Sequence, residues 1–182
     1  MQLDYLILGK GPSVSTFNWD RLLEIYPLMP INEAVTLVPP FYPGEVNVVV
    51  QDWDPIRRLI ATTFPEPNQI LVPSEFIDQA RKARPDIWWT PFRLADVPKG
   101  STACVAMHFI REWAEHKRKI RVGCIGMDAY FGGNTAYAGA FADKLKEPIW
   151  RKGDYAVVNA QITKWADTLN IDLLDLPSEV CA

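Results

Sequence analysis

Short apolar runs alternate with helical patterns along this chain, and that alternation constrains the fold more than any other feature. The β-branched run at 46–50 is typical of a strand covered on both faces. Amphipathic segments between such runs favour helices that pack on a parallel sheet. We therefore predict an α/β sandwich around a mostly parallel sheet. The predicted strands are 3–8, 34–38, 46–50, 69–72, 87–91, 120–127 and 171–176. The predicted helices begin at Asn18, Asp54, Pro73, Ser101 and Asp154.

Composition places the chain among ordinary globular proteins. It has 182 residues, of which 48% are hydrophobic and 23% are charged. This length suits one domain, which we predict to span residues 1–182. A net charge of −3 argues against a broad basic face and hence against a nucleic-acid partner.

The cysteines and the amino terminus indicate where the protein works. Cys104, Cys124 and Cys181 make an odd count without a Cys-x-x-Cys pair, which disfavours a disulfide framework or a zinc ribbon. The first residues lack the basic region and cleavage site of a signal peptide, and no apolar stretch reaches about 18 residues. We therefore expect a soluble protein of the cytoplasm, which is a reducing compartment.

Three polar or glycine-rich features follow predicted strands. They are Gly9-Lys10-Gly11-Pro12-Ser13, Gln51-Asp52 and the segment from Gly126 through Met127 to Tyr130. Ligands of open α/β sheets bind beyond the carboxyl ends of strands, and parallel strands bring those ends to one edge. We therefore predict that the three features converge on a ligand site.

The Gly9-Lys10-Gly11-Pro12-Ser13 loop has two interpretations. Glycines let a backbone approach a ligand closely and can expose N–H groups to a phosphate. The loop lacks the spacing of a P-loop and the third glycine of a dinucleotide fingerprint. The alternative is a plain turn between a strand and a helix.

Polar side chains near residue 130 are candidates for chemistry. Asp128 could bind a ribose hydroxyl or transfer a proton, or it could merely cap a turn. The hydroxyls of Tyr130 and Tyr137 could donate to a leaving phosphate without a metal, or the rings could simply pack. His108 and His116 point about 80° apart on one helix, so they do not form a metal pair.

Several of these motifs together resemble the bacterial CMP-sialic-acid-dependent sialyltransferases. The opening strand and its Gly-x-Gly-Pro-Ser loop are similar to theirs, and also to those of the 6-hydroxymethylpterin diphosphokinase-like family. Asn32 stands where the sialyltransferases carry an asparagine that contacts the nucleotide. Gly100-Ser101-Thr102-Ala103 resembles their Thr-Ser-Gly segment, and Gly126-Met127-Asp128-Ala129-Tyr130 resembles their Ser-Gly-Ile-Asp-Phe-Tyr motif.

The resemblance implies a Rossmann-like glycosyltransferase fold that binds a CMP-type nucleotide sugar and requires no metal cofactor. Gly9 to Ser13, Asn32, Ser101 with Thr102, and Gly126 to Asp128 would line the nucleotide. Tyr130 matches the first of two tyrosines that stabilise the leaving phosphate, and Tyr137 lies nearest the second.

Two departures from that family bear on chemistry. Lys10 replaces an asparagine and brings a positive charge to the phosphate edge. The histidine that serves the family as catalytic base is missing, and Asp154 is the candidate in its place. An aspartate, with an ordinary pKa of about 3.9, is a weak base unless it is desolvated.

Three functions fit these observations. The first is transfer of a sugar from a nucleotide-activated donor. The second is Mg²⁺-dependent diphosphoryl transfer from a nucleoside triphosphate, with Asp52 and Asp128 as candidate metal ligands. The third is a non-catalytic nucleotide-binding protein that kept the fold and lost the base.

Overall fold

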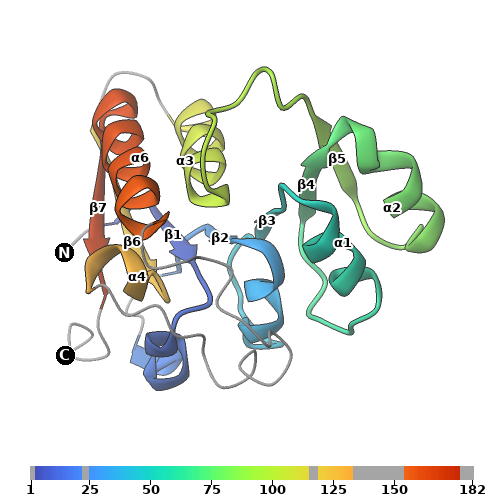
Figure 1. Cartoon of the computed structure of the whole chain (residues 1–182). Coiled ribbons are helices and arrows are strands. Elements are labelled where there is room, and N and C mark those ends of the chain that lie inside the picture. Colours follow the sequence, from blue (N-terminus) through green and yellow to red (C-terminus); the bar gives the residue numbers. More distant parts are fainter. Residues whose placement is uncertain (1–2, 22–24, 115–118, 133–153, 177–182) are drawn as a thin grey trace.

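A computed structural model describes residues 3–21, 25–114, 119–132 and 154–176 of the chain (Figure 1). The strands of the described residues are β1 (Tyr5–Leu8), β2 (Leu28–Pro30), β3 (Asn47–Val49), β4 (Gln69–Pro73), β5 (Trp89–Phe92), β6 (Ile120–Ile125) and β7 (Ile171–Asp175). The α-helices are α1 (Trp53–Ile60), α2 (Ile77–Ala83), α3 (Thr102–Trp113), α4 (Asp128–Phe131) and α6 (Asp154–Leu169). Short 3₁₀ helices are η1 (Pro12–Thr16), η2 (Trp19–Arg21), η3 (Asn32–Leu37) and η4 (Ser74–Phe76).

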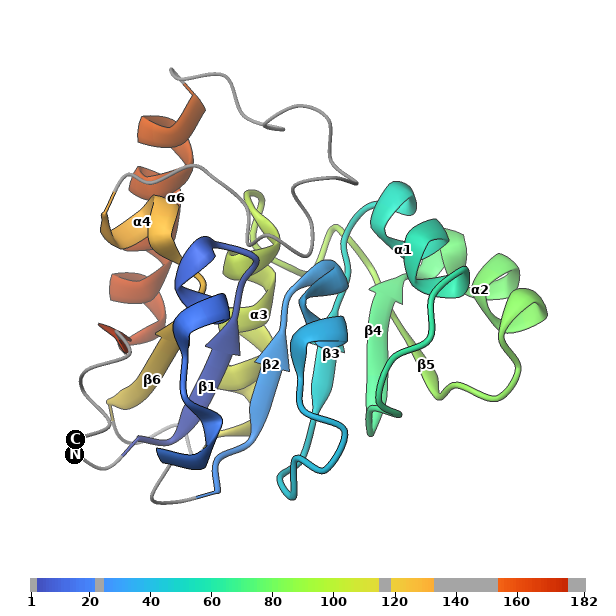
Figure 2. The same cartoon turned by 90° about the horizontal axis from the view of Figure 1, so that it is seen from below.

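The strands lie in the order β5-β4-β3-β2-β1-β6-β7, and every pairing between them is parallel. Two sheets, β2-β1-β6-β7 and β3-β4-β5, make up this order. Isolated bridges from Leu28 to Val46 and from Ile31 to Val49 join them along β2 and β3. Figure 2 shows β6, β1, β2, β3 and β4 side by side. The predicted parallel α/β architecture is therefore confirmed.

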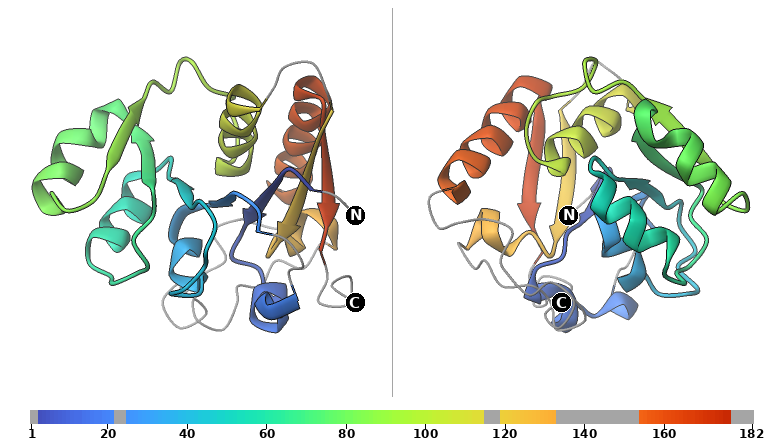
Figure 3. Two further views of the ribbon diagram at one scale, coloured as in Figure 1. Left: turned by 180° about the vertical axis from the view of Figure 1, so that it is seen from behind. Right: turned by 45° about the vertical axis from the view of Figure 1, so that its right-hand side comes forward.

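Helices cover both faces of the strands and make three layers (Figures 1 and 3). Side chains alternate between two buried clusters, as the pleat of a strand requires. Leu6 and Leu8 of β1 pack with Ile56 of α1 in one cluster, toward η1, η3, α1 and α2. Ile7 of β1 packs in the other cluster with Met107 of α3 and residues of α6. Strands buried on both faces explain the apolar runs of the sequence.

The second strand does not lie where the sequence pattern placed it. Residues 34–38 belong to η3, and the strand is β2, which ends at Pro30. Asn32 turns the chain with a φ of +54°, and the Thr36 hydroxyl donates to the Glu33 carbonyl 2.8 Å away. Local bonds of this kind favour a tight helix over a ladder. The strand expected at 34–38 is therefore wrong.

The remaining elements lie close to the predicted ranges. The helix expected from Asn18 is described only as the three residues of η2, where the Asn18 side chain accepts from the Asp20 N–H at 3.1 Å. The helix that begins beside Ser101 ends at Trp113, and the strand expected at 87–91 is displaced to β5. These differences leave the order of strands and helices intact.

Candidate functional site

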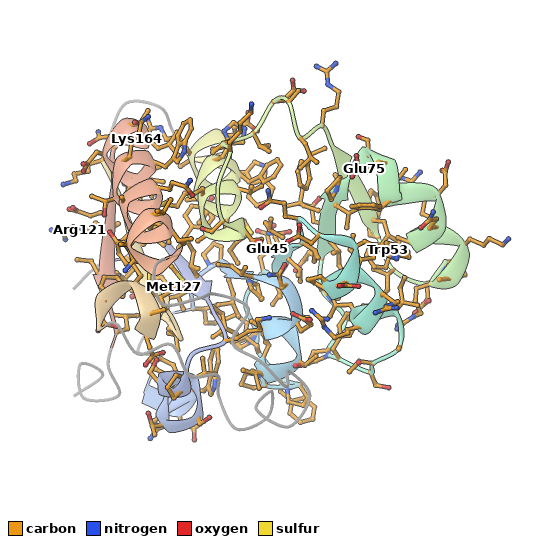
Figure 4. All side chains as sticks on the ribbon, viewed as in Figure 1. Glu45, Trp53, Glu75, Arg121, Met127 and Lys164 are labelled. Atoms are coloured by element: carbon orange, nitrogen blue, oxygen red, sulfur yellow. The ribbon has the colours of Figure 1, made fainter. Side chains whose placement is uncertain are left out.

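The carboxyl ends of β1 and β6 lie at the point where the strand order reverses. From β1 the chain proceeds outward through β2, β3, β4 and β5, and then returns to β6 on the other side of β1. Such a switch point is where open α/β sheets bind ligands. The loop Gly9 to Ser13 follows β1, and Gly126 to Asp128 follows β6. Figure 4 labels Met127 beside α4 at this edge of the sheet.

Hydrogen bonds tie the two loops together directly. The Gly11 N–H donates to the Gly126 carbonyl at 2.8 Å. The Ser13 hydroxyl donates to Asp128 Oδ2 at 2.8 Å, and its oxygen accepts from the Gly126 N–H at 3.0 Å. The Ser13 N–H points at the same carboxylate, 3.2 Å from Oδ1 and 3.3 Å from Oδ2. The predicted convergence of the glycine loop with Asp128 is therefore confirmed.

Three glycines make this contact of loops sterically feasible. A Cβ on Gly9 would lie 2.3 Å from the Gly126 carbonyl oxygen, and one on Gly11 would lie 2.1 Å from Asp128 Oδ2. Gly126 itself has a φ of +72°, and a Cβ there would lie 2.3 Å from Val14. The glycines are thus explained by the packing of one loop on the other.

The same bonds change the expected role of the loop in binding an anion. The N–H groups of Gly9, Gly11, Ser13 and Val14 all donate to acceptors within the protein, and Pro12 has no N–H to offer. In this structure these N–H groups are therefore engaged within the protein, and phosphate binding by the loop stays a prediction. The interpretation as a structural turn accounts for their geometry.

The lysine of the loop is held in an ion pair. Lys10 Nζ lies 2.9 Å from Glu33 Oε2, and the Arg58 Nε–H donates to Oε1 of the same carboxylate. Burial raises the pKa of Glu33, but the Lys10 charge and hydrogen bonds from Lys10 and Arg58 outweigh burial and lower it overall. Glu33 therefore stays ionised between two cations. Sequence reasoning missed Glu33 and Arg58 because their partners lie more than twenty residues away.

Asn32 carries an acceptor without a donor. It follows β2, whose neighbour Ile31 donates its N–H to the Leu8 carbonyl at 2.9 Å. Within the described part of the chain, Asn32 Oδ1 is buried and accepts no hydrogen bond. A buried polar atom without a partner costs about 1–3 kcal/mol, and a functional role, strain, or a bound water or ion can account for one in a native structure.

Two acidic residues flank the switch point on either side. Asp52 follows β3, and desolvation of its carboxylate, followed by the charge of Asp54, raises its pKa. Asp175 ends β7, and its pKa is raised by burial and then by the charge of Asp128. Asp52 follows a strand three positions from β6, about 14 Å away at the spacing of neighbouring strands. Among the described side chains, no cluster of three or more metal-ligating residues includes Asp52 and Asp128.

Ser101 and Thr102 lie at the start of α3, on the opposite face of the sheet from η1. The Ser101 hydroxyl lies 3.6 Å from Cys104 Sγ, and Thr102 is buried. A Cβ on Gly100 would lie 3.0 Å from Gln161 Oε1 of α6. Among the described residues, no hydrogen bond joins Ser101 or Thr102 to the loop Gly9 to Ser13. Contact of these two residues with a nucleotide stays a prediction.

The candidate catalytic residues are only partly placed. The Tyr130 hydroxyl lies 3.1 Å from the Thr163 hydroxyl of α6, and Asn159 Nδ2 of α6 donates to the Ala129 carbonyl at 3.1 Å. Tyr130 is thereby held against α6. Asp154 is the first residue of α6, and its side chain is not among the described ones. Tyr137 lies outside the described residues altogether.

Among the described side chains, no group of three or more His, Cys, Asp or Glu could hold a metal ion. No helix of the described ranges is long and apolar enough to cross a membrane. A surface hollow of about 510 Å³ that includes Asn68 and Trp88 lies at the amino ends of β4 and β5, on the edge away from the switch point.

Comparison with known proteins rests on structure alone. No protein-family description matches the chain. No curated protein matches it significantly in sequence.

Solved structures of the sialyltransferase CST-II share its fold. A variant with tyrosine replaced by phenylalanine, in complex with CMP, has a TM-score of 0.55 at 14% identity and covers 97% of this chain and 82% of its own. A variant with asparagine replaced by alanine, also with CMP, has a TM-score of 0.53 at 16% identity over the same shares. A complex with a trisaccharide acceptor and CMP has a TM-score of 0.51 at 14% identity, again over 97% and 82%. This enzyme comes from Campylobacter jejuni. At such identity the likeness shows a common fold, and the expected Rossmann-like α/β fold is thereby confirmed.

Proposed function

We propose that this protein is a glycosyltransferase that binds a CMP-type nucleotide sugar, without a metal, at the carboxyl ends of β1, β2 and β6. The observation that carries the proposal is the convergence of the loops after these strands at the switch point. The shared fold with sialyltransferases solved in complex with CMP supports the choice of nucleotide.

Side chains at this edge suit a nucleoside monophosphate. Asp128 accepts hydrogen bonds from Ser13, but a carboxylate has about four acceptor positions, so one can take a ribose hydroxyl. Asn32 Oδ1 can accept from an exocyclic amine or a hydroxyl. Lys10 contributes positive charge at the end of β1. The remaining contacts to the nucleotide would come from the start of α3 and the end of β3, through Ser101, Thr102 and Asp52.

The reaction would be a displacement at the anomeric carbon of the donor sugar. The acceptor oxygen forms a bond to that carbon, the bond to the phosphate oxygen breaks, and its electron pair leaves with the nucleotide. The acceptor proton passes to a base, for which Asp154 is the candidate. Tyr130 and Tyr137 would donate to the departing phosphate. For this, the Tyr130 hydroxyl would give up its hydrogen bond with the Thr163 hydroxyl and donate to the phosphate instead.

The diphosphokinase alternative receives no support from this site. Its Mg²⁺ would need carboxylates that converge, but Asp52 and Asp128 follow strands three positions apart.

A panel of nucleotides tests the proposal. We expect CMP to raise the thermal unfolding midpoint without Mg²⁺, because a ligand that binds only the folded state stabilises that state. UMP, GDP and ATP should raise the midpoint less. If ATP with Mg²⁺ stabilises the protein and none of the other nucleotides does, the proposal is contradicted and diphosphoryl transfer is favoured.

Catalysis is tested separately from binding. We expect slow hydrolysis of a CMP-sugar that is lost in Tyr130→Phe and kept in Tyr42→Phe. Tyr42 is the matched control because its hydroxyl donates to the Tyr26 carbonyl, away from the switch point. Binding of CMP without any turnover in the wild type would identify a non-catalytic nucleotide-binding protein instead.

A further inference from the structure

A single buried carboxylate connects three segments at the carboxyl edge of the sheet. Glu33 is 5% exposed and lies at the start of η3. Its Oε2 pairs with Lys10 of the loop after β1, and its Oε1 accepts from Arg58 of α1. Its backbone carbonyl accepts from the Thr36 hydroxyl at 2.8 Å. The loop after β1, η3 and α1 are thus held by one residue.

The residue before this carboxylate has one of the two buried acceptors, Asn32 Oδ1 and Asn47 Oδ1, that lack a partner among the described residues. Asn32 precedes Glu33 and has a φ of +54°, a left-handed conformation that asparagine tolerates better than most residues. On its other side, the Ile31 N–H is bonded to Leu8 and the Ile31 carbonyl accepts from Ala34. Asn32 therefore lies between a strand bond and a buried ion pair, and both restrict where its amide points.

We infer that Glu33 is a positioning residue for the proposed nucleotide site: its ion pairs with Lys10 and Arg58 hold Asn32 so that Oδ1 accepts a hydrogen bond from an N–H or O–H group of the nucleotide. The inference rests on the proposed function. Lys10 and Arg58 bind different oxygens of Glu33, so losing the charge of Glu33 loosens both the loop after β1 and η3. Asn32 then loses its fixed orientation while its own side chain stays intact.

A double-mutant cycle tests this coupling. Calorimetry would measure the dissociation constant of CMP for the wild type, Glu33→Gln, Asn32→Ala and the double variant. Each single variant is expected to bind about tenfold more weakly, which corresponds to one lost hydrogen bond. The double variant should also bind CMP only about tenfold more weakly than the wild type, because Glu33 acts through Asn32.

Controls separate a positioning role from general destabilisation. Glu66→Gln makes the same chemical change at an exposed glutamate near the opposite edge of the sheet and should leave CMP binding unchanged. Unfolding midpoints of all variants should stay above the temperature of the binding measurement. If Glu33→Gln does not fold, Arg58→Gln removes one partner of Glu33 at a partly exposed position and should weaken CMP binding several-fold.

The outcomes distinguish this inference from the proposed function. Binding losses that multiply to about a hundredfold in the double variant, or unchanged binding by Glu33→Gln, overturn the positioning role alone. A wild type that does not bind CMP overturns the proposed function and the inference with it.

Discussion

Ser13 is the residue on which the contact between the two loops depends most. Its hydroxyl donates to Asp128 and accepts from Gly126. Ser13→Ala removes both bonds and leaves the Gly126 N–H without its acceptor, so we expect the free energy of unfolding to fall by about 1–3 kcal/mol. Urea unfolding would measure the loss. Ser15→Ala, an exposed position in the same 3₁₀ helix, is the control and should change stability little; equal effects would contradict the role of Ser13.

Gly126 has no tolerance for a side chain. Its φ is +72°, and a Cβ would lie 2.3 Å from Val14. Because the conformation and the clash both oppose a methyl group, Gly126→Ala should lower the free energy of unfolding by more than ~2 kcal/mol. Gly132→Ala is the matched control, since its Cβ would meet nothing nearer than the Asp128 carbonyl at 3.5 Å. A stable Gly126→Ala protein would refute the close packing of the loops.

Glu33 makes stability depend on pH in a definite direction. Its pKa is lowered in the folded protein, because pairing with Lys10 and Arg58 outweighs burial. The folded state then binds fewer protons than the unfolded state, so this contribution is present above the ordinary pKa of 4.5 and is lost as the pH falls through the folded value. We expect wild type to be more stable than Glu33→Gln at pH 7. The difference in unfolding free energy should shrink as the pH drops below 4.5, and a constant difference would contradict the ion pairs.

At the scale of elements, β6 and α3 hide two thiols. Cys124 and Cys104 are fully buried, and burial raises the pKa of each thiol, in Cys124 with a further rise from the charge of Asp175. Only the thiolate is reactive, so both should resist a thiol reagent in native buffer and react after denaturation. Peptide mapping by mass spectrometry would follow each site separately. Fast native labelling of either cysteine would contradict the burial of its element.

Elements were predictable where a single pattern dominated. The run at 46–50 and the amphipathic segment after Ser101 gave a strand and a helix near the expected places. The pattern failed at 34–38, where apolar residues pack as η3. Periodicity over five residues does not distinguish a buried 3₁₀ helix from a strand. The three-residue strand β2, which ends in proline, offered too little signal of its own.

At the scale of the molecule, the two sheets should unfold together. They are joined along β2 and β3, and one buried cluster extends from Leu6 of β1 to Trp89 of β5. Ile70→Ala in β4 and Ile120→Ala in β6 each leave a cavity at a fully buried position. Each should lower the free energy of unfolding by about 2–5 kcal/mol. Tryptophan fluorescence and circular dichroism should both report the same single unfolding transition. Two separate transitions would contradict the prediction of one domain over residues 1–182.

The site was predictable in outline only. Glycine and acidic residues after strands placed Gly9 to Ser13 beside Asp128, because parallel strands share an edge. The ion pairs of Glu33 depend on contacts 23 and 25 residues away, which no local pattern specifies. The same holds for Tyr130, whose hydroxyl meets Thr163 across 33 residues. Long-range side-chain contacts follow from packing, and a local sequence window contains little information about them.

The bond between Ser13 and Asp128 spans 115 residues of chain. During synthesis the amino-terminal loop therefore emerges long before its partner exists, and closing so large a loop carries an entropic cost that only the assembled sheet offsets. A nascent chain that stops before β6 has β1 to β5 but lacks the segment of the proposed site that carries Gly126 and Asp128. The proposed nucleotide site thus assembles only once about 70% of the polypeptide, through Asp128, has been made.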